Sequence, residues 1–163
     1  MNGGLIFSLL CSAIAIGFGV FTIFRVLAHP DGNAEMQRIA LAIREGASAY
    51  LKRQYTTIGV VGVILFILIY FELDHLTAIG FAIGAIMSGA AGFIGMHVSV
   101  RSNSRTAEAA RHGLNAALKV AFSGGAVTGM LVVGLGLLAV AGYYTALTIL
   151  AGPSIRSFLV DRI

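Results

Sequence analysis

Few side chains in this sequence are placed where they could do chemistry, and His97 is the one ionisable group well inside an apolar run. An imidazole within a membrane span can relay protons, since its ordinary pKa lies near neutrality. A lone histidine near the end of a run is more often an interfacial or hydrogen-bonded packing residue, and we favour that interpretation. Arg101 and Arg105 follow on the same segment and could contact an anionic substrate, although a membrane-surface anchor is the favoured interpretation.

Two glycine-rich motifs resemble nucleotide sites but lie in the wrong context. Residues 134–139 match the G-x-G-x-x-A dinucleotide fingerprint, yet they fall in the middle of an apolar run with no preceding strand. Residues 123–129 are glycine-rich without the Gly-Lys-Ser/Thr of a phosphate loop. The sequence also shows no metal-ligand spacing and no nucleophile paired with a base. We therefore expect no catalytic, cofactor-binding or metal-binding residue in this chain.

The elements that carry these residues are membrane helices. The mean hydropathy is +0.91 and only 11% of the 163 residues are charged, which is atypical of a soluble domain. A bilayer core of about 30 Å needs about 20 helical residues. Four apolar stretches meet this length or nearly so, and we predict spans at about 5–25, 55–73, 76–100 and 119–143. The fold class is thus an all-α membrane protein, and residues 1–163 form a single transmembrane region.

Charge placement predicts the orientation of these spans. Lys and Arg are concentrated in the first and third loops, and none lies in the second loop around residues 72–75. The positive-inside rule places the basic loops in the cytoplasm and the N-terminus outside, for an integral, multi-pass protein. Arg156 and Arg162 fall on the outer side under this scheme, which is a mild violation. The net charge of +4 then reflects span flanks in contact with the lipid bilayer, and we expect no nucleic-acid partner.

Two loop segments carry helical patterns of their own. Residues 33–57 predict an amphipathic cytoplasmic helix, with a stripe of apolar residues at helical spacing, that lies along the membrane or on a partner. The third loop predicts a helix from about Ser104, which could cap it, with a break or kink at Gly113. The fourth apolar run is too long for one span, so we expect the span to end near residues 142–144 and residues 145–150 to form a re-entry or a turn.

Small residues recur every four positions in the third and fourth spans. Gly80, Gly84, Ser88 and Gly92 form one series, and Gly125 and Gly129 repeat the spacing. Such spacing lets helix backbones approach closely, because packing rather than hydrophobic drive holds helices together in lipid. A tightly packed bundle is the favoured interpretation over a glycine-lined pore or hinge.

Three blocks of sequence resemble the membrane-integral, ion-pumping inorganic pyrophosphatases. The first is the connector at residues 32–58, which contains IREGASAYLKRQYTTI at residues 43–58. The second is GAIMSGAAGFIGM at residues 84–96 with RSNSRT at residues 101–106, and the third is ALKVAFSGGAVTGM at residues 117–130 with VGLGLL at residues 133–138. Ser102 and Ser104 are minor departures from the family pattern. The blocks are spread along most of the chain, from residue 32 to residue 138.

The resemblance implies a homodimeric pump of about sixteen helices per subunit, in which this chain is the start of the outer ring. Hydrolysis of magnesium-bound pyrophosphate would drive protons or sodium ions outward. Mg2+, and possibly K+, would be bound by residues outside this chain, because the family's substrate-binding acids and lysines begin in a later helix. We therefore expect an N-terminal portion of a pump that is inactive alone. A non-enzymatic four-helix membrane scaffold or assembly protein is the alternative.

Overall fold

The computed structural model describes residues 3–150, and these residues form four long helices joined by short connections. They are α1 (Gly3–Leu27), α2 (Ala34–Glu72), α3 (His75–Ala110) and α4 (Leu114–Leu150). Each is long and apolar enough to cross a membrane, so the predicted four-span, all-helical class is confirmed. The basic residues Arg156 and Arg162 lie outside the described part of the chain.

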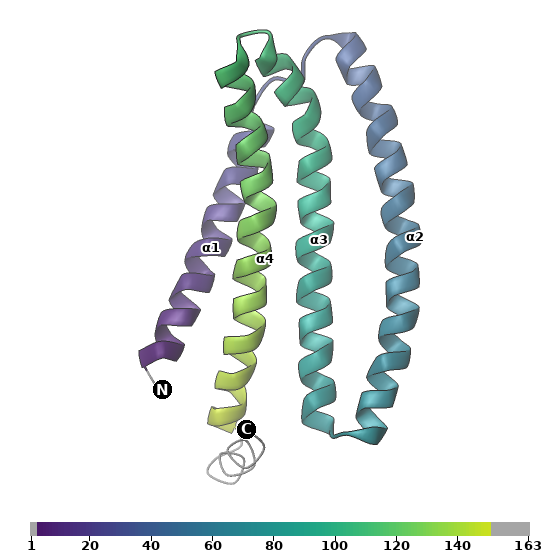
Figure 1. Cartoon of the computed structure of the whole chain (residues 1–163), viewed down its shortest axis with the longest axis vertical. Coiled ribbons are helices and arrows are strands. Elements are labelled where there is room, and N and C mark those ends of the chain that lie inside the picture. The colour runs from purple at the N-terminus through teal and green to yellow at the C-terminus, as the bar shows by residue number, and fades with distance from the viewer. Residues whose placement is uncertain (1–2, 151–163) are drawn as a thin grey trace.

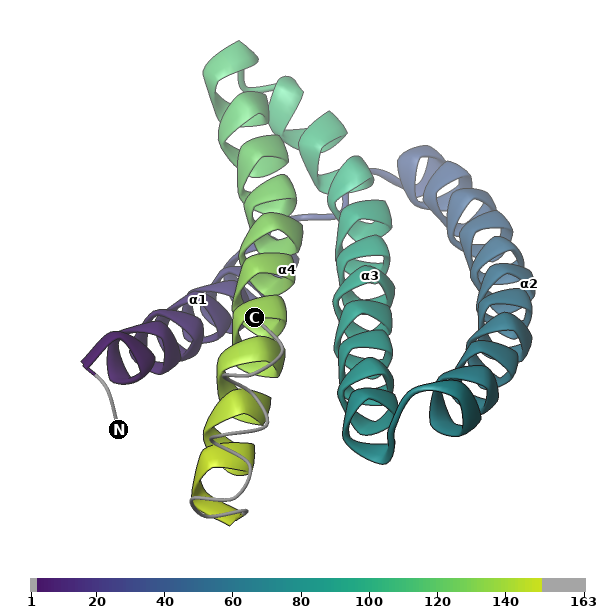
Figure 2. The ribbon, with the colours of Figure 1, turned by 60° about the horizontal axis from the view of Figure 1, so that its bottom comes forward.

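The helices stand side by side in a curved row rather than around a central axis. Figures 1 and 2 show the order α1, α4, α3, α2 across this row. Within the described residues, α4 packs against both α1 and α3, whereas α2 packs against α3 alone. The α1–α2 and α3–α4 connections meet at one end of the row, and the α2–α3 connection lies at the other (Figure 1). The row leaves apolar side chains exposed on broad faces, as expected for helices surrounded by lipid or by other helices.

The helices are longer than the predicted spans, and this corrects three expectations. The amphipathic segment 33–57 does not form a separate helix on the membrane surface, because α2 runs unbroken for 39 residues through the predicted second span. At 1.5 Å per residue, α2 is about 58 Å long, about twice the hydrocarbon thickness. Ser104 lies inside α3 rather than at a helix start. Residues 145–150 continue α4 instead of forming a turn or re-entry.

Local sequence signals define the ends of these helices. Asn33 caps α2 by accepting a hydrogen bond from the Met36 amide, and Asp74 caps α3 by accepting one from the Thr77 amide. The break expected at Gly113 is confirmed: α3 ends at Ala110, and Gly113 has a φ of +112°. That backbone conformation favours glycine, which has no Cβ to clash.

Close helix packing occurs at some glycines of α3 and α4 and not at others. A Cβ added to Gly95 of α3 would lie 2.8 Å from Thr128 of α4, and one added to Gly134 of α4 would lie 2.8 Å from Ile16 of α1. In contrast, Gly84, Gly125 and Gly129 have no neighbour within 4 Å of such an atom in the described chain, so their spacing does not mark a contact there. A small core lies between these helices and consists of Ala91, Val98, Val127 and Leu131.

Candidate functional site

Positive charge gathers toward one end of the helical row. In the described part of the chain, the Lys and Arg residues are Arg25, Arg38, Arg44, Lys52, Arg53, Arg101, Arg105, Arg111 and Lys119. Seven of these nine lie toward the end that carries the α1–α2 and α3–α4 connections (Figure 1), and Lys52 and Arg53 lie near the middle of α2. The opposite end, around the α2–α3 connection, carries Glu72, Asp74 and His75 within residues 3–150. The structure therefore concentrates most of the described cationic groups, which could bind an anion, toward one end of the row.

Asp31, in the connection between α1 and α2, is the centre of a polar network at this end. Its Oδ1 atom lies 2.7 Å from Nη1 of Arg105 and accepts a hydrogen bond of 3.1 Å from the Ser104 hydroxyl. Nη2 of Arg44 lies 3.5 Å from the same oxygen. One carboxylate thus joins the α1–α2 connection to α3 and to α2.

Arg105 also closes the end of α1. Its Nε and Nη2 atoms donate to the main-chain carbonyl of Leu27, the last residue of that helix, at 3.3 and 3.2 Å. Carbonyls at a helix C-terminus have no partner within the helix, and a cation there also opposes the negative end of the helix dipole. The Arg105 side chain is only 10% exposed. The membrane-surface anchor favoured from the sequence is therefore wrong for Arg105, which holds helices together instead.

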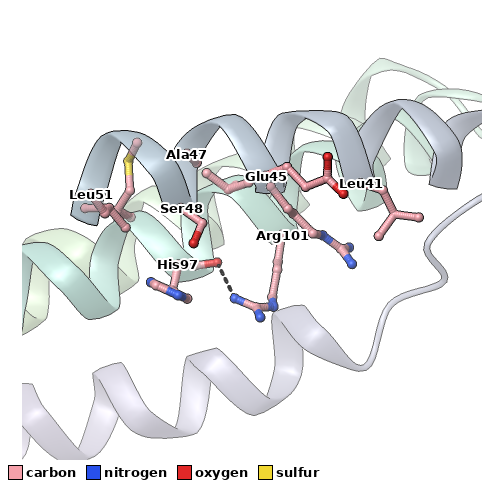
Figure 3. Close-up of a pocket in the computed structure, with 10 residues that line it drawn as sticks. Leu41, Glu45, Ala47, Ser48, Leu51, His97 and Arg101 are labelled. Atoms are coloured by element: carbon pink, nitrogen blue, oxygen red, sulfur yellow. Dashed lines mark hydrogen bonds between the residues drawn. The ribbon is translucent and has the colours of Figure 1, made fainter. Parts of the chain in front are cut away.

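A pocket of about 250 Å³ opens between α2 and α3 beside this network. Figure 3 shows its polar lining, with Ser48 on α2 across from His97 and Arg101 on α3. Arg101 donates from Nη1 to the carbonyl of His97 at 3.3 Å. Arg44 and Glu45 complete the charged part of the lining. The pocket thus combines two guanidinium groups, a carboxylate, an imidazole and a hydroxyl.

His97 behaves as a packing residue in this structure. Its Nδ1 lies 3.1 Å from the carbonyl of Phe93, one turn earlier, and its ring lies 4.3 Å from the Phe93 ring, centroid to centroid. Phe93 in turn meets Tyr55 of α2 in an edge-on contact at 5.8 Å. This arrangement supports the interpretation favoured from the sequence, that His97 is a hydrogen-bonded packing residue.

The glycine motifs have structural roles. Gly134 begins the G-x-G-x-x-A match inside α4 and packs against Ile16 of α1, with no strand before it. Gly124 lies against the Ser102 side chain of α3, where an added Cβ would be 2.7 Å from the hydroxyl oxygen. Among residues 3–150, no three His, Cys, Asp or Glu side chains gather as they would to hold a metal ion. The family resemblance implies a magnesium site outside this chain, and that site stays a prediction.

Asp31, which pairs with both Arg44 and Arg105, was not predicted as a site residue from the sequence. Its partner Arg105 is far away in the sequence, and only the fold brings the two together. One signal was available: Asp31 is an acid in a short connection flanked by basic segments, directly after Pro30 and before Gly32. Gly32 has a φ of +88°, so the connection turns sharply beside the carboxylate.

Comparison with known proteins gives the family. The family model described as inorganic H+ pyrophosphatase matches residues 13–160. A K+-insensitive pyrophosphate-energized proton pump of Methanosarcina mazei is 52% identical over 137 residues, which are 83% of this chain and 20% of that protein. A pump with the same description from Moorella thermoacetica is 45% identical over 134 residues, or 82% of this chain and 20% of that protein.

Relatives with a different named ion also match. A protein of Bacteroides thetaiotaomicron, provisionally named a K+-stimulated pyrophosphate-energized sodium pump, is 41% identical over 142 residues, covering 83% of this chain and 19% of that protein. The chain thus spans about a fifth of the length of the curated relatives it matches. Because the family model matches residues 13–160 of its 163 residues, this four-helix membrane chain belongs to the inorganic H+ pyrophosphatase family.

Proposed function

We propose that this chain is the N-terminal membrane portion of a pump that couples hydrolysis of magnesium-bound pyrophosphate to transport of protons or sodium ions. The match of residues 13–160 to the family model carries this proposal. Relatives that are similar to this chain are named as pumps energised by pyrophosphate, some for protons and some for sodium. In this proposal the four helices are outer-ring elements that pack around the helices responsible for the chemistry, and the pump is a homodimer.

The role of the described residues is positional. Asp31 and Arg105 fix the ends of α1 and α3 against each other, and the glycine contacts hold α4 between them. Magnesium would supply charge neutralisation of the phosphates and activation of the attacking water in the pump. No side chain described here is assigned to that step.

The proposed orientation has the N-terminus and the α2–α3 connection outside and the basic end in the cytoplasm. The clustering of Lys and Arg at one end supports it through the positive-inside rule. Single cysteines at Leu73 and His112, in a Cys11→Ser background, test it by labelling intact cells with a membrane-impermeant maleimide. We expect labelling at position 73 without permeabilisation and at position 112 only after it. The reverse pattern would show that the orientation is inverted.

The pump itself is tested in membrane vesicles from a host without a membrane pyrophosphatase, after expression of the gene in its full encoded length. We expect magnesium-dependent hydrolysis of pyrophosphate together with pyrophosphate-dependent uptake of protons, read with a pH-sensitive dye, or of radioactive sodium. Vesicles that carry the protein but hydrolyse no more pyrophosphate than vector controls would contradict the proposal. Hydrolysis without uptake of either ion would reject the transport half of it.

A further inference from the structure

The groove between α2 and α3 is polar at one end and apolar along the rest. The polar end is the 250 Å³ pocket beside the Asp31 network, which Figure 3 shows. Further along the same two helices lies a cavity of about 810 Å³. Its lining is almost entirely apolar and includes Ile58, Phe66, Phe81 and Phe93. A groove with these two parts matches a molecule that has one charged end and one hydrocarbon end.

The two parts form one continuous groove. On α2, Ser48 and Leu51 line the polar pocket, and Tyr55 and Ile58 continue into the apolar cavity at helical spacing. On α3 the ring of Phe93, which lines the cavity, packs against the ring of His97, which lines the pocket. These shared contacts place the pocket and the cavity end to end along one helix pair.

A lipid is long enough to reach from the polar pocket into the apolar cavity. The middle of the pocket lies near residue 46 of α2, and the lining of the cavity begins at Tyr55. These positions are about 9 residues apart, or about 14 Å at 1.5 Å per residue. Half of a 30 Å hydrocarbon core is about 15 Å, and a headgroup adds several more. A membrane lipid could therefore place its headgroup in the pocket and an acyl chain along the cavity.

The polar end favours a phosphate. Guanidinium groups bind phosphate through paired, charge-assisted hydrogen bonds, and Arg44 and Arg101 both line the pocket. The Nε donor of Arg44 is buried and has no hydrogen-bond partner within the described residues, which is costly unless a ligand supplies an acceptor. Glu45 is the one carboxylate of the lining, and in Figure 3 its oxygens lie near Leu41, away from His97 and Arg101.

We propose that this groove binds one anionic phospholipid, with its phosphodiester at Arg44, Ser48 and Arg101 and an acyl chain along the α2–α3 cavity. The positive charge of the pocket selects the anionic headgroup over a zwitterionic one, and the apolar cavity selects a lipid over free phosphate or pyrophosphate. The lipid contacts α2 and α3 together, so its binding stabilises α2 in the helical row.

The test uses the protein in its full encoded length, purified in detergent and stripped of lipid, with native mass spectrometry as the readout. Phosphatidylglycerol, phosphatidylcholine, inorganic phosphate and pyrophosphate are added separately. We expect phosphatidylglycerol to bind most tightly. Arg101→Gln should weaken that binding about tenfold, the scale for losing a charge-assisted phosphate contact. Arg101→Lys should restore only part of it, because a lysine cannot form the paired hydrogen bonds.

Two further variants separate the two parts of the groove. Arg53→Gln removes an exposed cation from α2 outside the pocket and should leave binding unchanged. Gly62→Leu places a side chain in the apolar cavity, where a Cβ meets no atom within 4 Å, and should weaken lipid binding without disturbing the fold. Circular dichroism confirms the folding of each variant.

Four outcomes would overturn the proposal. The first is equal loss of binding in the Arg53 and Arg101 variants, which would indicate general charge attraction. The second is preference for inorganic phosphate or pyrophosphate together with indifference to Gly62→Leu, which would make the pocket a site for the free anion. The third is equal affinity for phosphatidylcholine. The fourth is no lipid binding at all, which would show that another protein segment covers the groove.

Discussion

Replacing Asp31 with asparagine should lower the free energy of unfolding by about 2 kcal/mol. The variant keeps the shape of the side chain but removes the charge that faces Arg105 at 2.7 Å. Removing one partner of a fully buried ion pair costs about 3–5 kcal/mol. The cost here is smaller because Asp31 is 32% exposed and because Arg105 keeps its hydrogen bonds to the carbonyls of Leu27 and Arg101. About 2 kcal/mol is typical for the loss of a hydrogen bond between charged groups.

The measurement is a titration with sodium dodecyl sulfate in mixed micelles, with helix content followed by circular dichroism. Glu35→Gln provides the matched control, since it removes the same charge from a pair with Arg38 whose side chains are 62% and 75% exposed. Exposed pairs contribute little to stability, so the control should unfold with the wild-type protein. The Asp31 variant should unfold at clearly lower detergent fraction.

A double-mutant cycle gives the result that would refute this reasoning. If Asp31 acts through Arg105, the double variant Asp31→Asn, Arg105→Gln should lose less stability than the two single variants lose in sum. The difference, which is the coupling energy, should be about 1–2 kcal/mol. Strict additivity would show that the two side chains do not depend on each other. An Asp31→Asn variant that is as stable as the Glu35→Gln control would show that the ion pair with Arg105 contributes little to stability.

Three other substitutions test the packing. Gly95→Ala should destabilise the chain by about 1–3 kcal/mol, because Thr128 is branched and cannot easily move aside; Gly84→Ala, with open space around it, should be neutral or slightly stabilising in the same detergent titration. Tyr55→Phe should lower the free energy of unfolding by about 1 kcal/mol, because it removes the 2.7 Å hydrogen bond to a main-chain carbonyl of α3. Spin labels on α2 and α3 should then show a broader distribution of distances, and an unchanged distribution would show that the bond is dispensable. Gly113→Ala should cost about 1–2 kcal/mol at its φ of +112°, measured as detergent midpoint, and an unchanged midpoint would show that the turn can relax.

The membrane spans could be predicted from sequence because long apolar runs have few alternatives in a bilayer. The lengths of the helices could not. Residues 33–57 have an apolar stripe, which indicates a helix with two faces but not the direction of that helix relative to the span that follows. No proline interrupts the chain between Ala34 and Glu72, so hydrogen bonding continues without a break and one helix forms. The stripe is only partly the packed face: Ala40 and Leu51 are buried, whereas Ile39, Ile43 and Tyr50 are exposed.

The polar site was less accessible to sequence reasoning, for a related reason. Arg101 and Arg105 are four residues apart on one helix, so the sequence gives them the same face and suggests the same role. The fold separates them. Arg105 meets the end of α1 and is buried, whereas Arg101 lies one turn away in the pocket shared with α2. What distinguishes them is the position of the α1–α2 connection, which depends on contacts between distant segments.

The contacts hold α1, α3 and α4 together more tightly than they hold α2. The glycines of α4 and the Arg105 bonds to Leu27 hold α1, α3 and α4 together at several points along their length. Within the described chain, α2 meets α3 alone, and no residue of its most apolar window is buried. The polar contacts of α2 with the rest of the described chain include the hydrogen bond from Tyr55 to α3 and the long 3.5 Å contact of Arg44 with Asp31. An element with few buried contacts is the first to move when conditions change. The position of α2 is therefore the part of this arrangement that a ligand between α2 and α3 would control most strongly.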